Sequence, residues 1–245
     1  MTTYTPDPRD SSSLQSSFQP APAWSATDLA LRSFLLRVFN TMAGGLVVTG
    51  VVAYVAAASG LYAAIAGTPL LWVVMLAPVG LALLLGFGIE RMSPAAAQVA
   101  FWSYAALMGV SLAGIFLIYT GTSIARVFFV SAGAFAATAA WGYTTRTDLS
   151  RFGSFLFMGL IGIVLASVIN LFFASSAVQF AISVIGVLVF TGLTAYDTQR
   201  LKEMYASRSD ADARSRTAIM GALMLYLDFI NLFISLLQLF GTRRE

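Results

Sequence analysis

The chain has 245 residues, of which 58% are hydrophobic and only 10% are charged. This is too little polar surface to keep a soluble domain of this size dispersed in water, so the chain is expected to use lipid as its solvent. The formal net charge of +3 does not indicate a nucleic-acid-binding protein, because the Lys and Arg residues lie at the ends of apolar runs. They form no basic patch interleaved with aromatic residues.

The chain contains no Cys and no His, which excludes Cys/His zinc sites, thiolate nucleophiles and Ser-His catalysis. Its only lysine, Lys202, lies in a charged segment and cannot bind retinal within the membrane as a Schiff base. No nucleophile and base are recognisably paired. The protein is therefore not expected to be an enzyme or to carry a resident cofactor.

The first segment, residues 1–28, is rich in Ser, Gln, Pro and Thr and lacks the basic-then-apolar order of a secretory signal peptide. Its composition predicts a disordered polar tail. Residues 29–245 are expected to form the transmembrane domain.

Apolar runs fill the rest of the chain. A helix needs about 20 mostly apolar residues to cross the hydrocarbon core. Runs of this kind lie at about 33–58, 68–89, 96–120, 123–143, 152–174, 177–198 and 217–240. They predict an all-α integral membrane protein with seven transmembrane helices and with its two ends on opposite sides.

Positive charge collects in alternate connections, which are therefore expected to be cytoplasmic. The residues concerned are Arg9, Arg32, Arg91, Arg146, Arg151, Arg200, Lys202, Arg208, Arg214 and Arg216. Only the final pair, Arg243 and Arg244, opposes this trend. We therefore predict a cytoplasmic amino terminus and a carboxyl terminus outside the cytoplasm. The fourth run contains SAGAFAATAAWG (131–142), whose small residues predict close helix packing inside the bundle.

An aspartate lies deep within the seventh run. Asp228 is about ten residues from the start of this run, which places it roughly 15 Å below that start at helical rise. Asn231, Ser235 and Gln238 follow on the same helical face. Since a buried charge is costly in a membrane, this stripe indicates either a polar lining of a pathway or an interhelical hydrogen-bond seam.

A second aspartate closes the sixth run. Asp197 shares a helical face with Thr194 and lies three residues before Arg200, so it is either a site residue or an ordinary interfacial charge. When the sixth and seventh apolar runs are aligned across the membrane, Asp228 lies about two helical turns deeper than Asp197. The two could meet if the sixth helix continues into the cytoplasm and a water-filled vestibule reaches down to them. Arg91, on the same side, could bridge the carboxylates or simply follow the positive-inside rule.

Three segments resemble the Bax inhibitor-1 family, also called the transmembrane Bax inhibitor motif family, in its bacterial branch. They are DLSRFGSFLFMGLIGIVLASVINLFF (148–173), TAYDTQRLK (194–202) and LYLDFINLFISLLQLFG (225–241). The resemblance implies six helices surrounding a central C-terminal helix, and a pH-sensitive calcium leak. It also implies that Asp197 and Asp228 form the pH-sensing pair and cation gate, with Arg91 as the latch from the second helix.

The chemistry of paired carboxylates agrees with these expectations. Two carboxyl groups in contact cannot easily both ionise, so they titrate in coupled steps. Calcium takes oxygen ligands, which Asp197 and Asp228 can offer to a transiently bound ion. The expected partners are therefore the lipid bilayer of a bacterial inner membrane, calcium ions and protons. The alternative function is that of an interaction protein that modulates another membrane assembly, such as a membrane-bound protease.

Overall fold

The computed structural model describes residues 26–208 and 210–244, which are predominantly helical. In chain order the helices are α2 (Ala26–Ala58), α3 (Leu61–Ile65), α4 (Leu70–Gly88), η1 (Ile89–Arg91), α5 (Pro94–Leu112), α6 (Ile115–Ile118), α7 (Gly121–Thr144), α8 (Ser150–Phe173), α9 (Ser176–Ala206) and α10 (Ala211–Phe240). Residues 1–25, most of the predicted disordered tail, lie outside the described part. Residues 26–28 already belong to α2.

Seven stretches of these helices are long and apolar enough to cross a membrane. They are 28–58, 70–91, 94–118, 121–144, 150–173, 176–206 and 211–240. Each contains most of one predicted run, so the prediction of an all-α membrane protein with seven spanning helices is confirmed. Within the described residues the only β-pairing is an isolated bridge between Tyr119 and Arg243.

The spans are helical because a membrane offers no water to backbone N–H and C=O groups, so each segment must satisfy them internally. Polar residues at the span ends bond the first free N–H groups. Ser93 accepts a hydrogen bond from Ala96 N before α5, with Pro94 as first helical residue. Ser175 does the same for α9, and Asp210 for α10. These caps fix where the spans begin.

The helices α9 and α10 both extend beyond the apolar runs that predicted them. α9 continues to Ala206, eight residues past the predicted end, and α10 begins at Ala211. The extra turns carry the charged residues of this connection, and they form one side of the protein together with the start of α2, η1 and the α7–α8 connection. We call it the arginine-rich side. On it, Arg208 forms an ion pair of 2.7 Å with Glu90.

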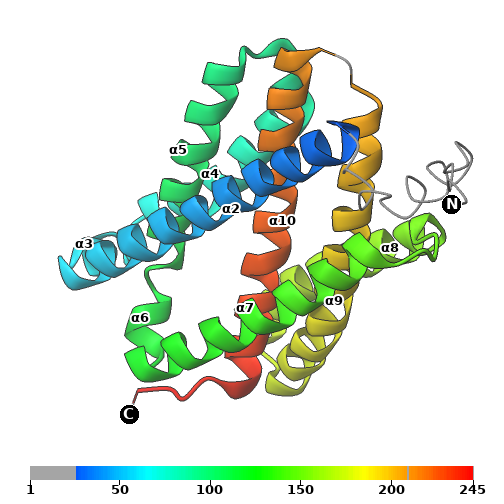
Figure 1. Ribbon diagram of the computed structural model, residues 1–245. Helices are drawn as coiled ribbons and strands as arrows, with labels where there is room; N and C mark the ends of the chain where they lie inside the picture. The colour runs from blue at the N-terminus through cyan, green and yellow to red at the C-terminus, as the bar shows by residue number, and fades with distance from the viewer. Residues whose placement is uncertain (1–25, 209, 245) are drawn as a thin grey trace, which may run out of the picture.

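The most buried helix is α10. In its most apolar stretch 72% of the residues are buried, compared with at most 33% in any other span. It packs against α2, α5, α7 and α9, whereas α8 packs mainly on α9. Figure 1 shows α10 passing behind α2 and α7 in the middle of the molecule. The stricter arrangement, in which six helices surround a central seventh, stays a prediction.

The small residues of α7 face two different environments. Phe135 and Ala139 are buried, and Gly142 lies so close to Ala195 of α9 that a Cβ there would overlap the Ala195 backbone. Ala136 and Ala140, by contrast, are exposed. The expectation that this segment packs inside the bundle is therefore correct for one face of α7 only.

The carboxyl-terminal residues are bonded to the connection between α6 and α7. Thr120 N donates to the Thr242 carbonyl at 3.0 Å, and Arg244 N donates to the Ile118 carbonyl at 2.9 Å. Thr242 N in turn donates to Ser123 Oγ at 2.8 Å. These bonds hold the end of α10 against the start of α7, on the side opposite the arginine-rich side.

Candidate functional site

Two aspartates meet between α9 and α10. Asp197 and Asp228 are both buried, with exposed fractions of 8% and 5%, and their side chains lie within hydrogen-bonding contact of each other. The contact is possible because α9 continues through Asp197 without a break, and because α9 and α10 pack along their length. The predicted difference in depth therefore does not keep the two carboxyl groups apart.

One oxygen of this pair has no donor. Asp228 Oδ2 is buried and accepts no hydrogen bond from any described residue. An ionised carboxylate can only accept hydrogen bonds, so two ionised aspartates in contact cannot bond each other. A single proton held between them converts the contact into a hydrogen bond. The burial of the pair makes this protonated form the one that best satisfies both groups.

The two carboxyl groups face a pocket of about 580 Å³ between α8, α9 and α10, which we call the dyad pocket. It is lined by Gly153, Ser154, Phe157, Leu160, Phe190, Leu193, Tyr196, Asp197, Arg200, Met224, Leu227, Asp228 and Asn231. Because Gly153 and Ser154 lie near the start of α8 and Arg200 lies near the end of α9, the pocket lies in the arginine-rich half of the protein. It combines an apolar wall with one cation and two acids.

The cation in this pocket is Arg200. It lies one turn after Asp197 on α9, lines the same pocket, and is close enough for its charge to act on the Asp197 carboxyl group. In the sequence, the sign of this proximity was the three-residue spacing between Asp197 and Arg200. An ordinary interfacial charge can have the same spacing. Arg200 is exposed, as an interfacial charge would be, and it also lines the pocket that holds the two acids.

Arg91 occupies a different place. It ends η1 with an exposed side chain and is not among the residues that line the dyad pocket. Its neighbour Glu90 pairs instead with Arg208, the contact described above. The role of Arg91 as a latch therefore stays a hypothesis.

The polar stripe on α10 divides along its length. Asn231 lines the dyad pocket, and its Nδ2 donates to the Leu227 carbonyl at 2.8 Å. Ser235 lies against α9, where a Cβ on Gly186 would overlap its hydroxyl oxygen. Thr194 of α9 is fully buried and donates to the Phe190 carbonyl at 2.7 Å.

At the other end of the stripe, Gln238 joins a polar cluster. Its Oε1 accepts hydrogen bonds of 2.8 Å from Gln179 Nε2 and from Ser183 Oγ. Asn170 of α8 adds a 3.2 Å bond from Nδ2 to Gln179 Oε1. Gln238 thus forms interhelical hydrogen bonds, whereas Ser235 Oγ donates to the Asn231 carbonyl of its own helix at 2.8 Å and packs on Gly186. Asn231 is the stripe residue next to the pair.

Comparison with known proteins decides the family. Residues 31–245 match the family model described as inhibitor of apoptosis-promoting Bax1. The chain belongs to the Bax inhibitor-1 family. The chain is similar to an uncharacterized protein of Rickettsia prowazekii, 46% identical over 89% of this chain and 93% of that protein. The inner membrane protein YbhL of Escherichia coli is 44% identical, over 87% and 93% respectively.

Proposed function

We propose that the protein is a pH-sensitive leak pathway for calcium, gated by Asp197 and Asp228. The observation that supports this most directly is the contact of two buried carboxyl groups inside membrane-spanning helices, at the edge of a pocket. Ionisable residues in this position are costly and mark ion or proton pathways in membrane proteins.

Proton loss supplies the gating force. Two unit negative charges 4 Å apart repel each other by about 4 kcal/mol at an effective dielectric constant of 20. Protonated, the pair holds α9 and α10 together by a hydrogen bond. Deprotonated, it pushes them apart and presents two anionic groups to the dyad pocket. Flux therefore increases as the pH rises through the upper titration step of the pair.

Calcium is the cation that suits these groups, because it is a hard ion bound by 6–8 oxygen ligands. Within the described residues, no three or more acidic side chains gather into a metal site. Two carboxylates alone bind calcium weakly. Weak binding is what permeation requires, since the ion must leave the site as readily as it enters.

The pathway continues from the dyad pocket along the polar stripe of α10. In the described conformation Gly186 and Ser235 are in contact, and Gln238 is bonded to Gln179 and Ser183. Separation of α9 from α10 at the pair opens this seam toward the far side. Asn231, Ser235 and Gln238 then become the lining of the open pathway.

The proposed setting is the bacterial inner membrane, because the relative YbhL is an inner membrane protein. The arginine-rich side faces the cytoplasm, which places the dyad pocket at the cytoplasmic mouth and the bonded carboxyl terminus outside. Protons that reach the pair then come from the cytoplasm.

The decisive experiment uses purified protein in liposomes that enclose a calcium-sensitive dye. Wild-type protein is expected to admit calcium faster at higher pH, and the double variant Asp197→Asn/Asp228→Asn is expected to lose the pH response. Asp148→Asn is the matched control, since Asp148 lies outside the spans, where it accepts a hydrogen bond from Ser150 N at 2.9 Å, and does not line the dyad pocket. Wild-type liposomes without calcium flux would exclude the leak, and would leave the alternative of a protein that acts by binding a membrane partner.

A further inference from the structure

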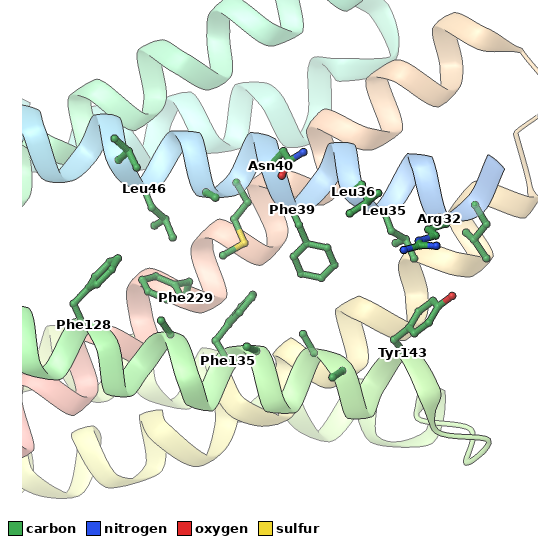
Figure 2. A pocket seen from close by; sticks show the side chains of 18 of the residues that line it. Arg32, Leu35, Leu36, Phe39, Asn40, Leu46, Phe128, Phe135, Tyr143 and Phe229 are labelled. Atoms are coloured by element: carbon green, nitrogen blue, oxygen red, sulfur yellow. The ribbon is translucent and has the colours of Figure 1, made fainter. Parts of the chain in front are cut away.

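A second and larger hollow lies between α2 and α7. Its volume is about 1,140 Å³, its walls are formed by residues of these two helices, and Phe229 of α10 contributes to its floor. Figure 2 shows Phe39 and Phe135 pointing into it from opposite sides. We call it the α2–α7 groove. It is separate from the dyad pocket, with which it shares no lining residue.

The groove is long and follows α2 across the membrane. From Arg32 to Val51, both of which line it, α2 rises about 28 Å, close to the roughly 30 Å thickness of the hydrocarbon core. An acyl chain that enters from one leaflet can therefore lie along the groove, with its headgroup at one end.

The composition of the groove points the same way. Apart from Asp28, Arg32, Asn40 and Tyr143, all lining residues are apolar or glycine. The α7 wall includes Ala136 and Ala140, whose small side chains leave the space open. The groove crosses the part of the membrane that contains lipid tails, and its mostly apolar walls match hydrocarbon.

One end of the groove is positively charged. Arg32 and Tyr143 lie at the same end, on the arginine-rich side (Figure 2). Lys202 of α9 reaches this end, where its Nζ donates to the Tyr143 carbonyl at 2.7 Å and lies 5.3 Å from the centre of the Tyr143 ring. With Asp28 counted, two cations and one carboxylate gather at this end. This is the level of the lipid headgroups, where cations attract anionic lipid.

We propose that the α2–α7 groove binds one anionic glycerophospholipid of the leaflet on the arginine-rich side. Its phosphate binds Arg32, and an acyl chain follows the groove past Ala140 and Phe135 to Phe229. The acyl chain thereby completes the packing between α2 and α7, two helices that the fold leaves apart over much of their length.

The test is native mass spectrometry of the full chain in mild detergent, with dioleoyl phosphatidylglycerol as the probe. One retained phosphatidylglycerol per chain is expected. Dioleoyl phosphatidylcholine, with the same acyl chains but no net charge, is expected to bind at least about fivefold more weakly, the effect of one cation near anionic lipid. Glycerol 3-phosphate keeps the phosphate but has no acyl chain to bury in the groove, and no retention of it is expected. Equal retention of the two lipids would overturn the proposal, as would binding of glycerol 3-phosphate alone.

Two variants locate the lipid, each with a matched control. Arg32→Gln is expected to weaken phosphatidylglycerol retention about fivefold, whereas Arg151→Gln, which removes an exposed arginine of the same side, leaves it unchanged.

The second pair tests the groove itself. Ala140→Trp fills the groove and is expected to abolish retention, whereas Ala137→Trp, on an exposed face of α7 outside the groove, is not expected to change it. Equal effects within either pair would refute the site. A lipid-free dimer that Ala140→Trp dissociates would show a second copy there instead.

Discussion

Asp228 and Phe229 are consecutive residues of α10 that line two different hollows. Asp228 faces the dyad pocket between α8, α9 and α10, whereas Phe229 forms part of the floor of the α2–α7 groove. Successive residues on a helix point about 100° apart, which allows one turn of α10 to serve both. The most buried helix of the protein therefore connects the ionisable pair directly to the packing of α2 and α7.

Phe229 should be a major packing residue of this region. It is 2% exposed, and its ring makes edge-to-face contacts with Phe128 and Phe135 at centroid distances of 5.4 and 5.6 Å. At about 0.5–1.5 kcal/mol for each aromatic pair, Phe229→Leu is expected to lower stability by about 1–3 kcal/mol. Thermal unfolding in detergent measures this. Phe87→Leu, at a position 86% exposed, is the control and should have no effect.

The aspartate pair should behave as one titrating unit. Replacement of either Asp197 or Asp228 by Asn removes the shared proton, and each single variant is therefore expected to abolish the pH dependence of calcium flux. In wild type, proton loss leaves two adjacent negative charges, so flux should increase as pH rises.

The double variant separates one unit from two sites. If the carboxyl groups share a proton, Asp197→Asn/Asp228→Asn resembles either single variant, because the coupling is already lost. Liposome flux measured across a pH series gives the comparison. Additive effects of the two substitutions, or a pH response that persists in both single variants, would contradict the coupled pair.

Arg200 should set the pH at which flux changes. Arg200 lines the same pocket as Asp197, and a positive charge there favours an ionised carboxyl group, so Arg200→Gln is expected to move the midpoint of the flux profile to higher pH. The liposome assay across a pH series measures this midpoint. A midpoint unaffected by Arg200→Gln would remove this residue from the gate.

A latch at Arg91 predicts that Arg91→Ala increases leak at neutral pH with the fold intact. The position of Arg91 outside the dyad pocket favours unchanged flux. The same liposome assay at neutral pH gives the answer.

The contact between Gly186 and Ser235 should tolerate no added volume. A Cβ on Gly186 would overlap Ser235 Oγ, so Gly186→Ala is expected to destabilise the protein by about 1–3 kcal/mol. In the double variant Gly186→Ala/Ser235→Ala the overlapping oxygen is absent, so part of the lost stability should be restored. Gly133→Ala is the control, because no atom lies within 4 Å of a Cβ there. Thermal unfolding of the four proteins is the measurement, and equal stability of the two glycine variants would disprove the close approach.

Seven crossings place the two ends of the chain on opposite sides. A reporter fused after residue 245 is expected outside the cytoplasm, and one inserted between α9 and α10, at 207–210, inside. Paired fluorescence and alkaline phosphatase fusions provide the measurement. A cytoplasmic carboxyl terminus would contradict the seven-crossing arrangement.

The spans could be predicted because each apolar run is long enough to cross the membrane and is bounded by polar residues. The end of α9 and the start of α10 could not be predicted in this way. The segment TQRLKEMY (198–205) has no membrane signal, yet it continues α9 as a helix. This continuation is also why the estimated depths of Asp197 and Asp228 suggested separation. The sequence placed both acids on polar helical faces, but only the packing of α9 on α10 brings them together.

The two hollows were beyond prediction for a different reason. In a membrane protein the residues that face lipid, core and groove are equally apolar, so periodicity does not distinguish them. The small residues of α7 indicated close packing correctly at Gly142 but gave no sign that Ala136 and Ala140 face an open groove. The sequence indicated Arg91 as the cation that could bridge the pair, and only the fold places Arg200 in the dyad pocket.

The burial of α10 also bears on how the protein is made. Chains are synthesised from the amino terminus, so α10 emerges after α2, α5, α7 and α9, the helices against which it packs. Those helices must enter the bilayer with the surfaces that α10 later covers still facing lipid or one another. Assembly therefore finishes when a helix carrying a carboxyl group enters between its predecessors, and a neutral, protonated Asp228 makes that last insertion less costly.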